Sequence, residues 1–137
     1  MAQIKEYLLD TNVILRHIKQ DGKRQHIEQA HKVFRELDTG KIKVSLVESV
    51  VVELCYVLTF YYNLSRSEFV QVFTGLLEAE NIKADKGLYE KAIKIYSATE
   101  LDITDCILIA KYQLNKGKFA DILSFDDELA ENKSIKV

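Results

Sequence analysis

The chain has 137 residues, with 19 Lys and Arg against 21 Asp and Glu, which gives a formal net charge of −2 at pH 7. A chain of this length holds one hydrophobic core, so we expect a single domain over residues 1–137. Hydrophobic residues make up 47% and charged residues 29%, which excludes a disordered or collagen-like chain. The small negative charge excludes a general attraction to nucleic acid, so any such contact must be local.

Neither a membrane span nor a disulfide framework is predicted. No apolar stretch reaches the roughly 18 residues of a span, and charges interrupt the N-terminal segment where a signal peptide would be apolar. We therefore expect a cytoplasmic protein. Cys55 and Cys106 lie in apolar runs, which predicts buried free thiols. His17, His26 and His31 have no Cys nearby, so the spacing does not fit a zinc site and any bound metal should have oxygen ligands.

The first half of the chain predicts, in order, a strand, two helices, a strand and a long helix, over residues 4–9, 11–20, 26–40, 42–46 and 47–63. The first strand stops at Asp10, and Thr11 or Asn12 is expected to cap the following helix. Gly40 is the expected end of the second helix. The last helix is too long and too apolar for a strand, so we expect it to be buried.

The second half predicts helices over 65–78, 86–99 and 104–115, strands over 81–84 and 119–125, and a closing strand at 134–137. The first of these helices opens on Ser65 or Ser67, and the last ends at Gly117. The strand at 119–125 is expected to be buried and to end at Asp126. Strands separated by such helices cannot form hairpins, which predicts an α/β fold with a mainly parallel sheet and helices on both faces.

Acidic residues stand where such folds gather their chemistry. Asp10 and Asp126 each follow a predicted strand, and the carboxyl ends of parallel strands meet at one edge of a sheet. Asp105 lies in the first turn of the helix at 104–115, where the helix dipole favours an anion. Taken singly, each of the three also fits an ordinary turn or helix cap. Only their combination indicates a shared site.

Glu53 is the most informative acid, because it lies in the middle of the apolar helix at 47–63. We expect its carboxylate to be buried and therefore paired, protonated or bound to a metal. The chain offers no Lys or Arg between residues 44 and 65 to pair with it. This pattern favours a metal or active-site role. Glu48, at the start of the same helix, is explained by the helix dipole.

At these positions the sequence resembles the PIN-domain nucleases, particularly the VapC-type toxins of toxin–antitoxin pairs. Four segments match that family's motifs in order, namely LLDTNVILRH (8–17), VVELCYVL (51–58), ITDCILIA (103–110) and LSFDDEL (123–129). The resemblance implies a PIN-like three-layer α/β/α sandwich. It also implies that Asp10, Glu53, Asp105 and Asp126 hold a divalent metal for phosphodiester hydrolysis. Asp127 adjoins Asp126 and could take the role of the fourth acid instead. We favour Asp126 because it directly follows Ser-Phe, as the family's acid does.

The resemblance therefore predicts a metal-dependent endoribonuclease that cleaves RNA, with a small antitoxin as partner and a homodimer as assembly. Carboxylate oxygens select Mg²⁺ or Mn²⁺, and carboxylates crowded together repel one another unless a cation neutralises them. Asn12 could orient Asp10 or a phosphate, and Ser124 could form a hydrogen bond within the site. A helix cap and a strand-end hydroxyl explain these two residues equally well.

RNA contact needs local positive charge. Residues 16–43 contain eight Lys and Arg against four Asp and Glu, and we take Arg16, Lys19, Lys23 and Arg24 as candidate phosphate contacts. A solvated helix face is an equal explanation, because acids are interleaved with these residues. An aromatic cluster could stack on unpaired bases, although we favour a role in the core or a subunit interface; it comprises Tyr56, Phe60, Tyr61 and Tyr62.

Two other functions compete. Asp10, Thr11 and Asn12 after the first strand also resemble the start of haloacid-dehalogenase-type phosphatases, which use an Asp nucleophile. That motif requires a second Asp at the position of Asn12 and leaves Glu53 unexplained. The other alternative is a PIN-like domain that binds a partner without catalysis. Cleavage that requires Mg²⁺ or Mn²⁺ and stops on chelation distinguishes these readings.

Overall fold

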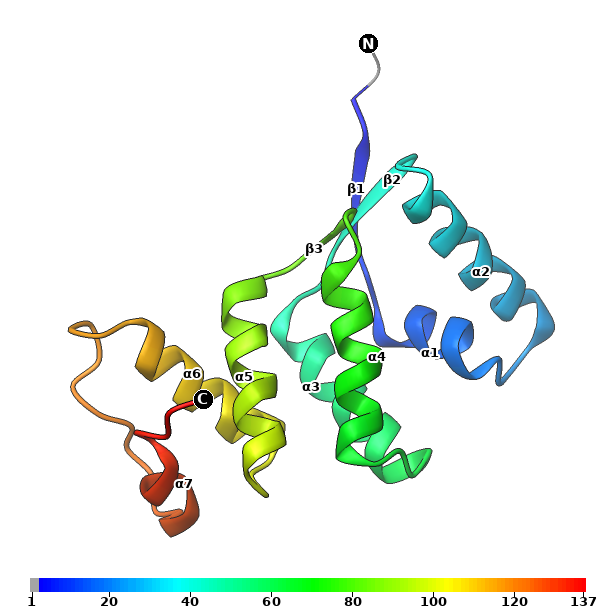
Figure 1. The fold of residues 1–137 in the computed structure, drawn as a ribbon. Coiled ribbons are helices and arrows are strands. Elements are labelled where there is room, and N and C mark those ends of the chain that lie inside the picture. Colours follow the sequence, from blue (N-terminus) through cyan, green and yellow to red (C-terminus); the bar gives the residue numbers. More distant parts are fainter. Residues whose placement is uncertain (1–2) are drawn as a thin grey trace.

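The computed structural model describes residues 3–137 and alternates strands with helices (Figure 1). The sheet consists of β1 (Lys5–Leu8), β2 (Ile42–Ser45) and β3 (Ile82–Lys83). The helices are α1 (Thr11–Lys19), α2 (Arg24–Asp38), α3 (Glu48–Tyr56), α4 (Arg66–Glu78), α5 (Lys86–Ala98), α6 (Ile103–Leu114) and α7 (Asp127–Asn132), and α3 continues into a π-helix (Val57–Tyr61). Within residues 3–137, no helix combines the length and the hydropathy needed to cross a bilayer.

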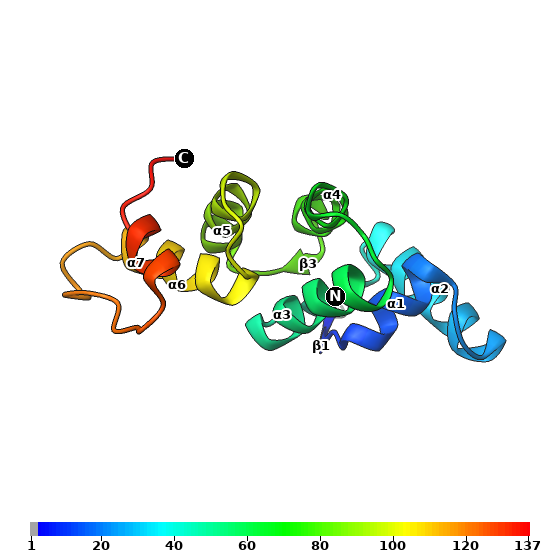
Figure 2. The same cartoon turned by 90° about the horizontal axis from the view of Figure 1, so that it is seen from below.

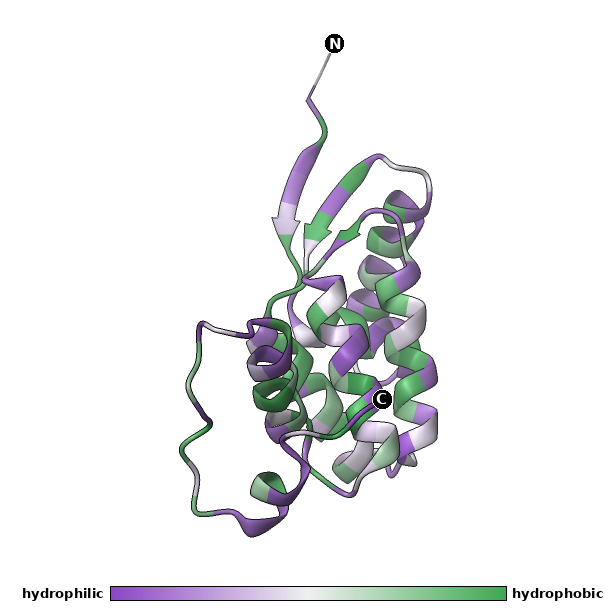
Figure 3. Cartoon of the chain, turned by 60° about the vertical axis from the view of Figure 1, so that its left-hand side comes forward, coloured by the Kyte–Doolittle hydropathy of each residue, from purple (hydrophilic) through white to green (hydrophobic). Residues whose placement is uncertain are grey.

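The three strands are parallel and lie in the order β1-β2-β3, with Val44 of β2 paired to Tyr7 on one side and to Ile82 on the other. Figure 3 shows all three arrowheads pointing toward the helices. Each strand is followed directly in the sequence by a helix, β1 by α1, β2 by α3 and β3 by α5. Seen from below, α4 and α5 lie on one side of β3 and α3 lies on the other (Figure 2). The predicted α/β sandwich with a parallel sheet is therefore confirmed.

Aromatic side chains of α4 and α5 form the centre of the core. Phe69 and Phe73 are completely buried, and their stacked rings lie 5.6 Å apart. Tyr96 meets the Phe69 ring edge-on and Tyr89 meets the Phe73 ring edge-on, each at 5.8 Å. Such aromatic pairs add to the stabilisation from the apolar area that they bury. Helices α4 and α5 are therefore held together by ring contacts over their whole length.

Arg66 ties the start of α4 to the segment that precedes α6. Its guanidinium lies 3.5 Å from the centroid of the Tyr96 ring and donates hydrogen bonds of 2.7 Å to the carbonyls of Tyr96 and Leu101. Ser65 caps the same helix in a reciprocal capping box with Glu68, which confirms the first of the two predicted caps. These contacts fix the chain just before Ile103, and they thereby position the first turn of α6.

Several predicted boundaries need correction. Asp10, rather than Thr11 or Asn12, caps α1, because its Oδ1 accepts the backbone N–H of Thr11 at 2.8 Å. Helix α2 begins at Arg24, two residues earlier than predicted, and β3 is only two residues long. Cys55 and Cys106 are buried free thiols, as predicted.

The predicted buried strand at 119–125 is wrong, as is the closing strand at 134–137. Residues 119–125 form an exposed loop between α6 and α7, in which the side chains of Leu123 and Phe125 are almost entirely exposed (Figure 1). An apolar run becomes a strand only when its backbone groups pair with the edge of a sheet. Residues 119–125 do not pair with β1, which forms an edge of the described sheet and whose four residues are exposed.

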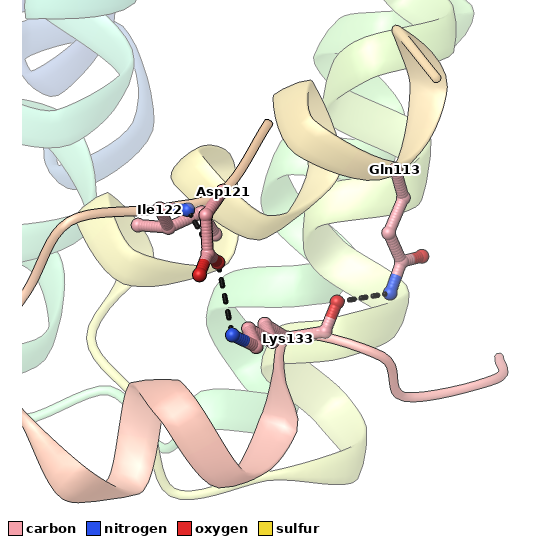
Figure 4. Close-up of polar contacts among 4 residues, drawn as sticks. All are labelled: Gln113, Asp121, Ile122 and Lys133. Carbon is pink, nitrogen blue, oxygen red and sulfur yellow. Dashed lines mark hydrogen bonds and ion pairs between the residues drawn. The ribbon is translucent and has the colours of Figure 1, made fainter. Parts of the chain in front are cut away.

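Side-chain hydrogen bonds and an ion pair, rather than pairing between strands, hold the C-terminal segment in place. Gln113 donates from Nε2 to the carbonyls of Lys133 and Ile135 at 3.0 and 2.9 Å. Lys133 forms an ion pair of 2.9 Å with Asp121, whose Oδ1 also accepts the backbone N–H of Ile122 (Figure 4). These bonds connect α6, the loop and the segment after α7. They determine where Asp126 lies.

Candidate active site

Asp10 lies directly beyond β1, as predicted, and its carboxylate is exposed. One of its oxygens caps α1, so the other remains available to a ligand. The next residue, Thr11, is fully buried, and its hydroxyl has no hydrogen-bond partner among residues 3–137. A buried hydroxyl without a hydrogen-bond partner is uncommon. At the end of β1, the Thr11 hydroxyl is therefore free to form a hydrogen bond.

Glu53 is exposed, so the prediction that its carboxylate is buried is wrong. Helix α3 buries Val51, Leu54 and Cys55 and turns a different face to solvent. That outer face carries Ser49, Glu53, Tyr56 and Phe60, all exposed and spaced by three or four residues. The helix looks apolar on every side only because two of these four residues are aromatic. Exposure leaves the Glu53 carboxylate open to a cation or a substrate.

Asp105 and Asp126 act on each other electrostatically. Partial burial of Asp105 raises the pKa of its carboxyl group above the ordinary value, and the negative charges of Asp126, Asp102 and Glu128 raise it further. Asp105 lies in the first turn of α6, and Asp126 caps α7. Two predicted site residues from different segments therefore lie close enough to repel. Crowding of this kind is relieved by proton uptake or by a bound cation.

Asp102 and Glu128 were not predicted as members of this acidic group. Asp102 immediately precedes Ile103 at the start of α6, and Glu128 follows the predicted acid by two residues. Both could have been found from their short separation from Asp105 and Asp126. The group thus contains four carboxylates around the first turns of α6 and α7.

The structure also distinguishes Asp126 from its neighbour Asp127. Asp126 accepts hydrogen bonds from the backbone N–H groups of Glu128 and Leu129 at 2.9 and 3.2 Å, and its own N–H donates to Ser124 Oγ at 3.0 Å. Asp127 is the first residue of α7, and it is absent from the charges that raise the pKa of Asp105. Ser124 therefore orders the turn that carries Asp126, consistent with a supporting role.

The described residues do not assemble all four predicted acids. Asp105 and Asp126 lie near each other, and Glu53 shares a groove with Asn12. Among residues 3–137, however, no group of three or more His, Cys, Asp or Glu side chains is arranged to hold a metal ion. The chemistry of the candidate donors fits Mg²⁺ or Mn²⁺, because all of them are carboxylate oxygens. The negative charges near Asp105 also favour a bound cation.

Two grooves flank the outer face of α3. One, of about 420 Å³, contains Asn12 and Glu53, and the other, of about 330 Å³, contains Asp102 and Thr104. Tyr56 lines both of them. The outer face of α3 therefore lies between a groove beside α1 and a groove beside the start of α6.

The four candidate phosphate contacts have different surroundings. Arg24 pairs with Glu28 at 3.1 Å on the exposed surface of α2, and Lys23 is exposed at the start of that helix. Arg16 lines the groove that contains Glu53, and Lys19 Nζ lies 5.1 Å from the centroid of the Tyr62 ring. Arg16 is thus the candidate contact that shares a groove with one of the predicted acids.

Replacing Asp105 by Asn is expected to leave the metal-free protein as stable as the wild type, or more stable, at pH 7. Because folding raises its pKa, Asp105 contributes stability below the unfolded value of about 3.9, and this contribution is lost as the pH rises through the folded pKa. Urea denaturation with a chelator, at pH 7 and pH 4, should show an advantage of the variant that shrinks at pH 4. Asp127→Asn is the matched control, and a loss above about 1 kcal/mol in Asp105→Asn would identify a structural carboxylate.

Comparison with known proteins gives a consistent result. The sequence profile of the PIN domain family matches residues 7–134. A VapC ribonuclease from Aquifex aeolicus (strain VF5) is 29% identical over 119 residues, which cover 86% of this chain and 85% of that protein. No solved structure matches the chain.

Proposed function

Because the chain belongs to the PIN-domain family, we propose that it is a metal-dependent endoribonuclease of the VapC toxin type. The observation that carries this proposal is the repulsive carboxylate pair of Asp105 and Asp126, which the first turn of α6 and the N-cap of α7 bring together. A merely structural pair of acids would be expected to have a cationic partner, and none of the ion pairs among residues 3–137 involves either of them.

In this proposal Asp10, Glu53, Asp105 and Asp126 hold a Mg²⁺ or Mn²⁺ ion. Such an ion lowers the pKa of water and neutralises charge on a phosphate, which is the chemistry that phosphodiester hydrolysis requires. The carboxylates position the cation, and no side-chain nucleophile is needed. Asn12 lies beside Glu53 and can orient a phosphate through its amide. Ser124 holds the turn that presents Asp126.

The substrate in this proposal is single-stranded RNA, because a flexible strand can bend into a narrow acidic site that a stiff duplex would not enter. Arg16, Lys19, Lys23 and Arg24 supply local phosphate contacts on a chain whose net charge is −2. The resemblance of the chain's motifs to those of VapC-type toxins further suggests a small antitoxin as partner, and the similarity to a VapC ribonuclease supports this assignment. A homodimer in the cytoplasm completes the proposal.

Incubation of the purified protein with single-stranded RNA tests the function directly. Cleavage is expected with Mg²⁺ or Mn²⁺, and it should stop on chelation and return when the metal is restored. A 5′-labelled RNA resolved on a sequencing gel distinguishes internal cleavage from trimming at the ends. Cleavage that persists in excess chelator, or a complete lack of cleavage with either metal, contradicts the proposal.

One observation favours a second candidate, a PIN-domain protein that binds a partner without catalysis. Within residues 3–137 no group of three or more His, Cys, Asp or Glu side chains is arranged to hold a metal ion, so the four predicted acids do not form one metal site in the isolated chain. RNA binding without cleavage under any of the metal conditions above would support this candidate. Cleavage that requires metal would exclude it.

A further inference from the structure

An exposed groove beside Glu53 carries a set of aromatic rings. The groove has a volume of about 420 Å³ and lies between α1, the loop after it, and the junction of α3 with the π-helix. We call it the tyrosine groove, and its polar and aromatic lining includes Asn12, Arg16, Glu53, Tyr56, Tyr61 and Tyr62. A volume in this range is typical of pockets for small ligands.

Most rings of this groove lie outside the core. Tyr56 and Tyr61 are 62% and 71% exposed, and nearby Phe60 is 68% exposed, whereas Tyr62 packs against the core. The part of the prediction that places the cluster in the core is therefore wrong for three of its four residues, and the alternative of a subunit interface stays a prediction. Large aromatic side chains exposed together on a surface indicate a binding face. The described structure therefore leaves two explanations for them, stacking on a ligand and contact with another protein chain.

The π-helix explains how two tyrosines reach the same groove. In an α-helix, residues five apart point about 140° away from each other. The chain from Val57 to Tyr61 is instead wound as a π-helix, and the Tyr62 N–H donates to the carbonyl of Val57 at 3.1 Å. This wider turn brings residues five apart onto nearly the same side. Tyr56 and Tyr61 consequently line one groove.

Positive charge lies beside these rings. Arg16 forms no ion pair with any residue in the range 3–137. Its side chain lies against Gly22, whose φ is +105° and where a Cβ atom would come within 2.6 Å of Arg16 Nε. Lys19 adds a second positive charge, since its ammonium group lies 5.1 Å from the centroid of the Tyr62 ring. The turn at Gly22 therefore leaves space for a guanidinium that is free to bind an anion.

A hydrogen bond holds the wall of the groove in place. The Tyr62 hydroxyl donates to Asp21 Oδ2 at 2.9 Å and so joins the π-helix to the loop between α1 and α2. Partial desolvation and the bond to Asp21 raise the pKa of Tyr62. The bond fixes one wall of the groove before any ligand binds, which lowers the entropic cost of binding.

We propose that the tyrosine groove binds one unpaired nucleotide of single-stranded RNA, with the base stacked on Tyr56 and Tyr61 and a phosphate on Arg16. This inference rests on the ribonuclease proposed above and adds a site of base recognition next to Glu53. A nucleotide supplies both an aromatic face and a negative charge, and so it matches rings and a free guanidinium at once. A second copy of the chain would instead have to bury that unpaired charge, which is costly.

Fluorescence of a single-stranded RNA that contains 2-aminopurine tests the stacking. The RNA is titrated with protein in excess chelator, so that binding is observed without cleavage. Wild-type protein is expected to quench the fluorescence, and Tyr61→Ala should weaken binding roughly 5- to 150-fold and abolish the quenching. Tyr61→Phe keeps the ring and should behave like the wild type. Phe119→Ala, which removes an aromatic side chain outside the groove, is the matched control.

The outcomes separate the possible occupants. Unchanged RNA affinity and quenching in Tyr61→Ala overturn the proposal. So does a wild-type dimer, measured by sedimentation, that Tyr61→Ala dissociates without weakening RNA binding per chain, since the groove is then an interface between copies. RNA cleavage by a protein that shows no quenching overturns the groove but keeps the ribonuclease. Quenching by a protein that never cleaves RNA keeps the groove and rejects the ribonuclease.

Discussion

Replacing Glu53 by Gln is expected to lower the rate of RNA cleavage on the order of 10³-fold, because it removes one carboxylate from the proposed cation site. A loss of this size corresponds to several kcal/mol of transition-state stabilisation. Glu53 is exposed, and no hydrogen bond or ion pair joins its side chain to another residue of the range 3–137. The free energy of unfolding should therefore change by less than about 0.5 kcal/mol. Loss of activity in a protein of unchanged stability identifies a chemical role.

The matched control for this experiment is Glu90→Gln, which makes the same change at an exposed position of α5. Initial cleavage rates of the two variants and the wild type are compared with Mn²⁺ at a fixed RNA concentration. Glu90→Gln should cleave at the wild-type rate. Wild-type activity in Glu53→Gln would remove Glu53 from the site, and with it the role assigned to the outer face of α3.

Replacing Phe73 by Ala is expected to destabilise the protein by about 3–5 kcal/mol, which is a large part of the stability of a domain of this size. Phe73 is completely buried, and its ring packs between Phe69 and Tyr89. The substitution removes these contacts and leaves a cavity between α4 and α5. Urea denaturation followed by circular dichroism measures the change.

Phe60→Ala is the control, because it makes the same substitution at a side chain that is 68% exposed. Its effect on the free energy of unfolding should stay within about 0.5 kcal/mol. A loss below about 1 kcal/mol for Phe73→Ala would contradict the described packing of α4 against α5. It would also question the position of α6, which Arg66 and Tyr96 anchor from the same core.

Helices α1 to α6 and the first two strands could be predicted from the sequence because local signals determine them, whereas the short helix α7 was not predicted. Ser65 and Glu68 form a capping box at the start of α4, and apolar residues recur at helical spacing in α1 and α2. The strand at 119–125 failed for the opposite reason. A strand exists only with a partner edge, and no local pattern in Phe119–Phe125 states whether that edge is available.

The local positions of the candidate site residues could be predicted from the sequence better than their arrangement in space. The positions of Asp10 and Asp105 follow from a strand end and a helix start, which local sequence specifies. The exposure of Glu53 could not be inferred from apolar neighbours, because Tyr56 and Phe60 on its own face are apolar in type yet exposed. The proximity of Asp105 to Asp126 depends on how α7 packs back toward α6, a tertiary contact with no local signature.

If Asp10, Glu53, Asp105 and Asp126 share one divalent cation, the effect of Mn²⁺ on amide NMR spectra will reveal it. Substoichiometric Mn²⁺ broadens signals from nuclei close to the bound ion. We expect amides next to all four acids to broaden together, and Asp105→Asn and Glu53→Gln each to weaken the effect at every one of these positions. Broadening confined to the neighbourhood of Asp105 and Asp126, with sharp signals around Asp10 and Glu53, would contradict it.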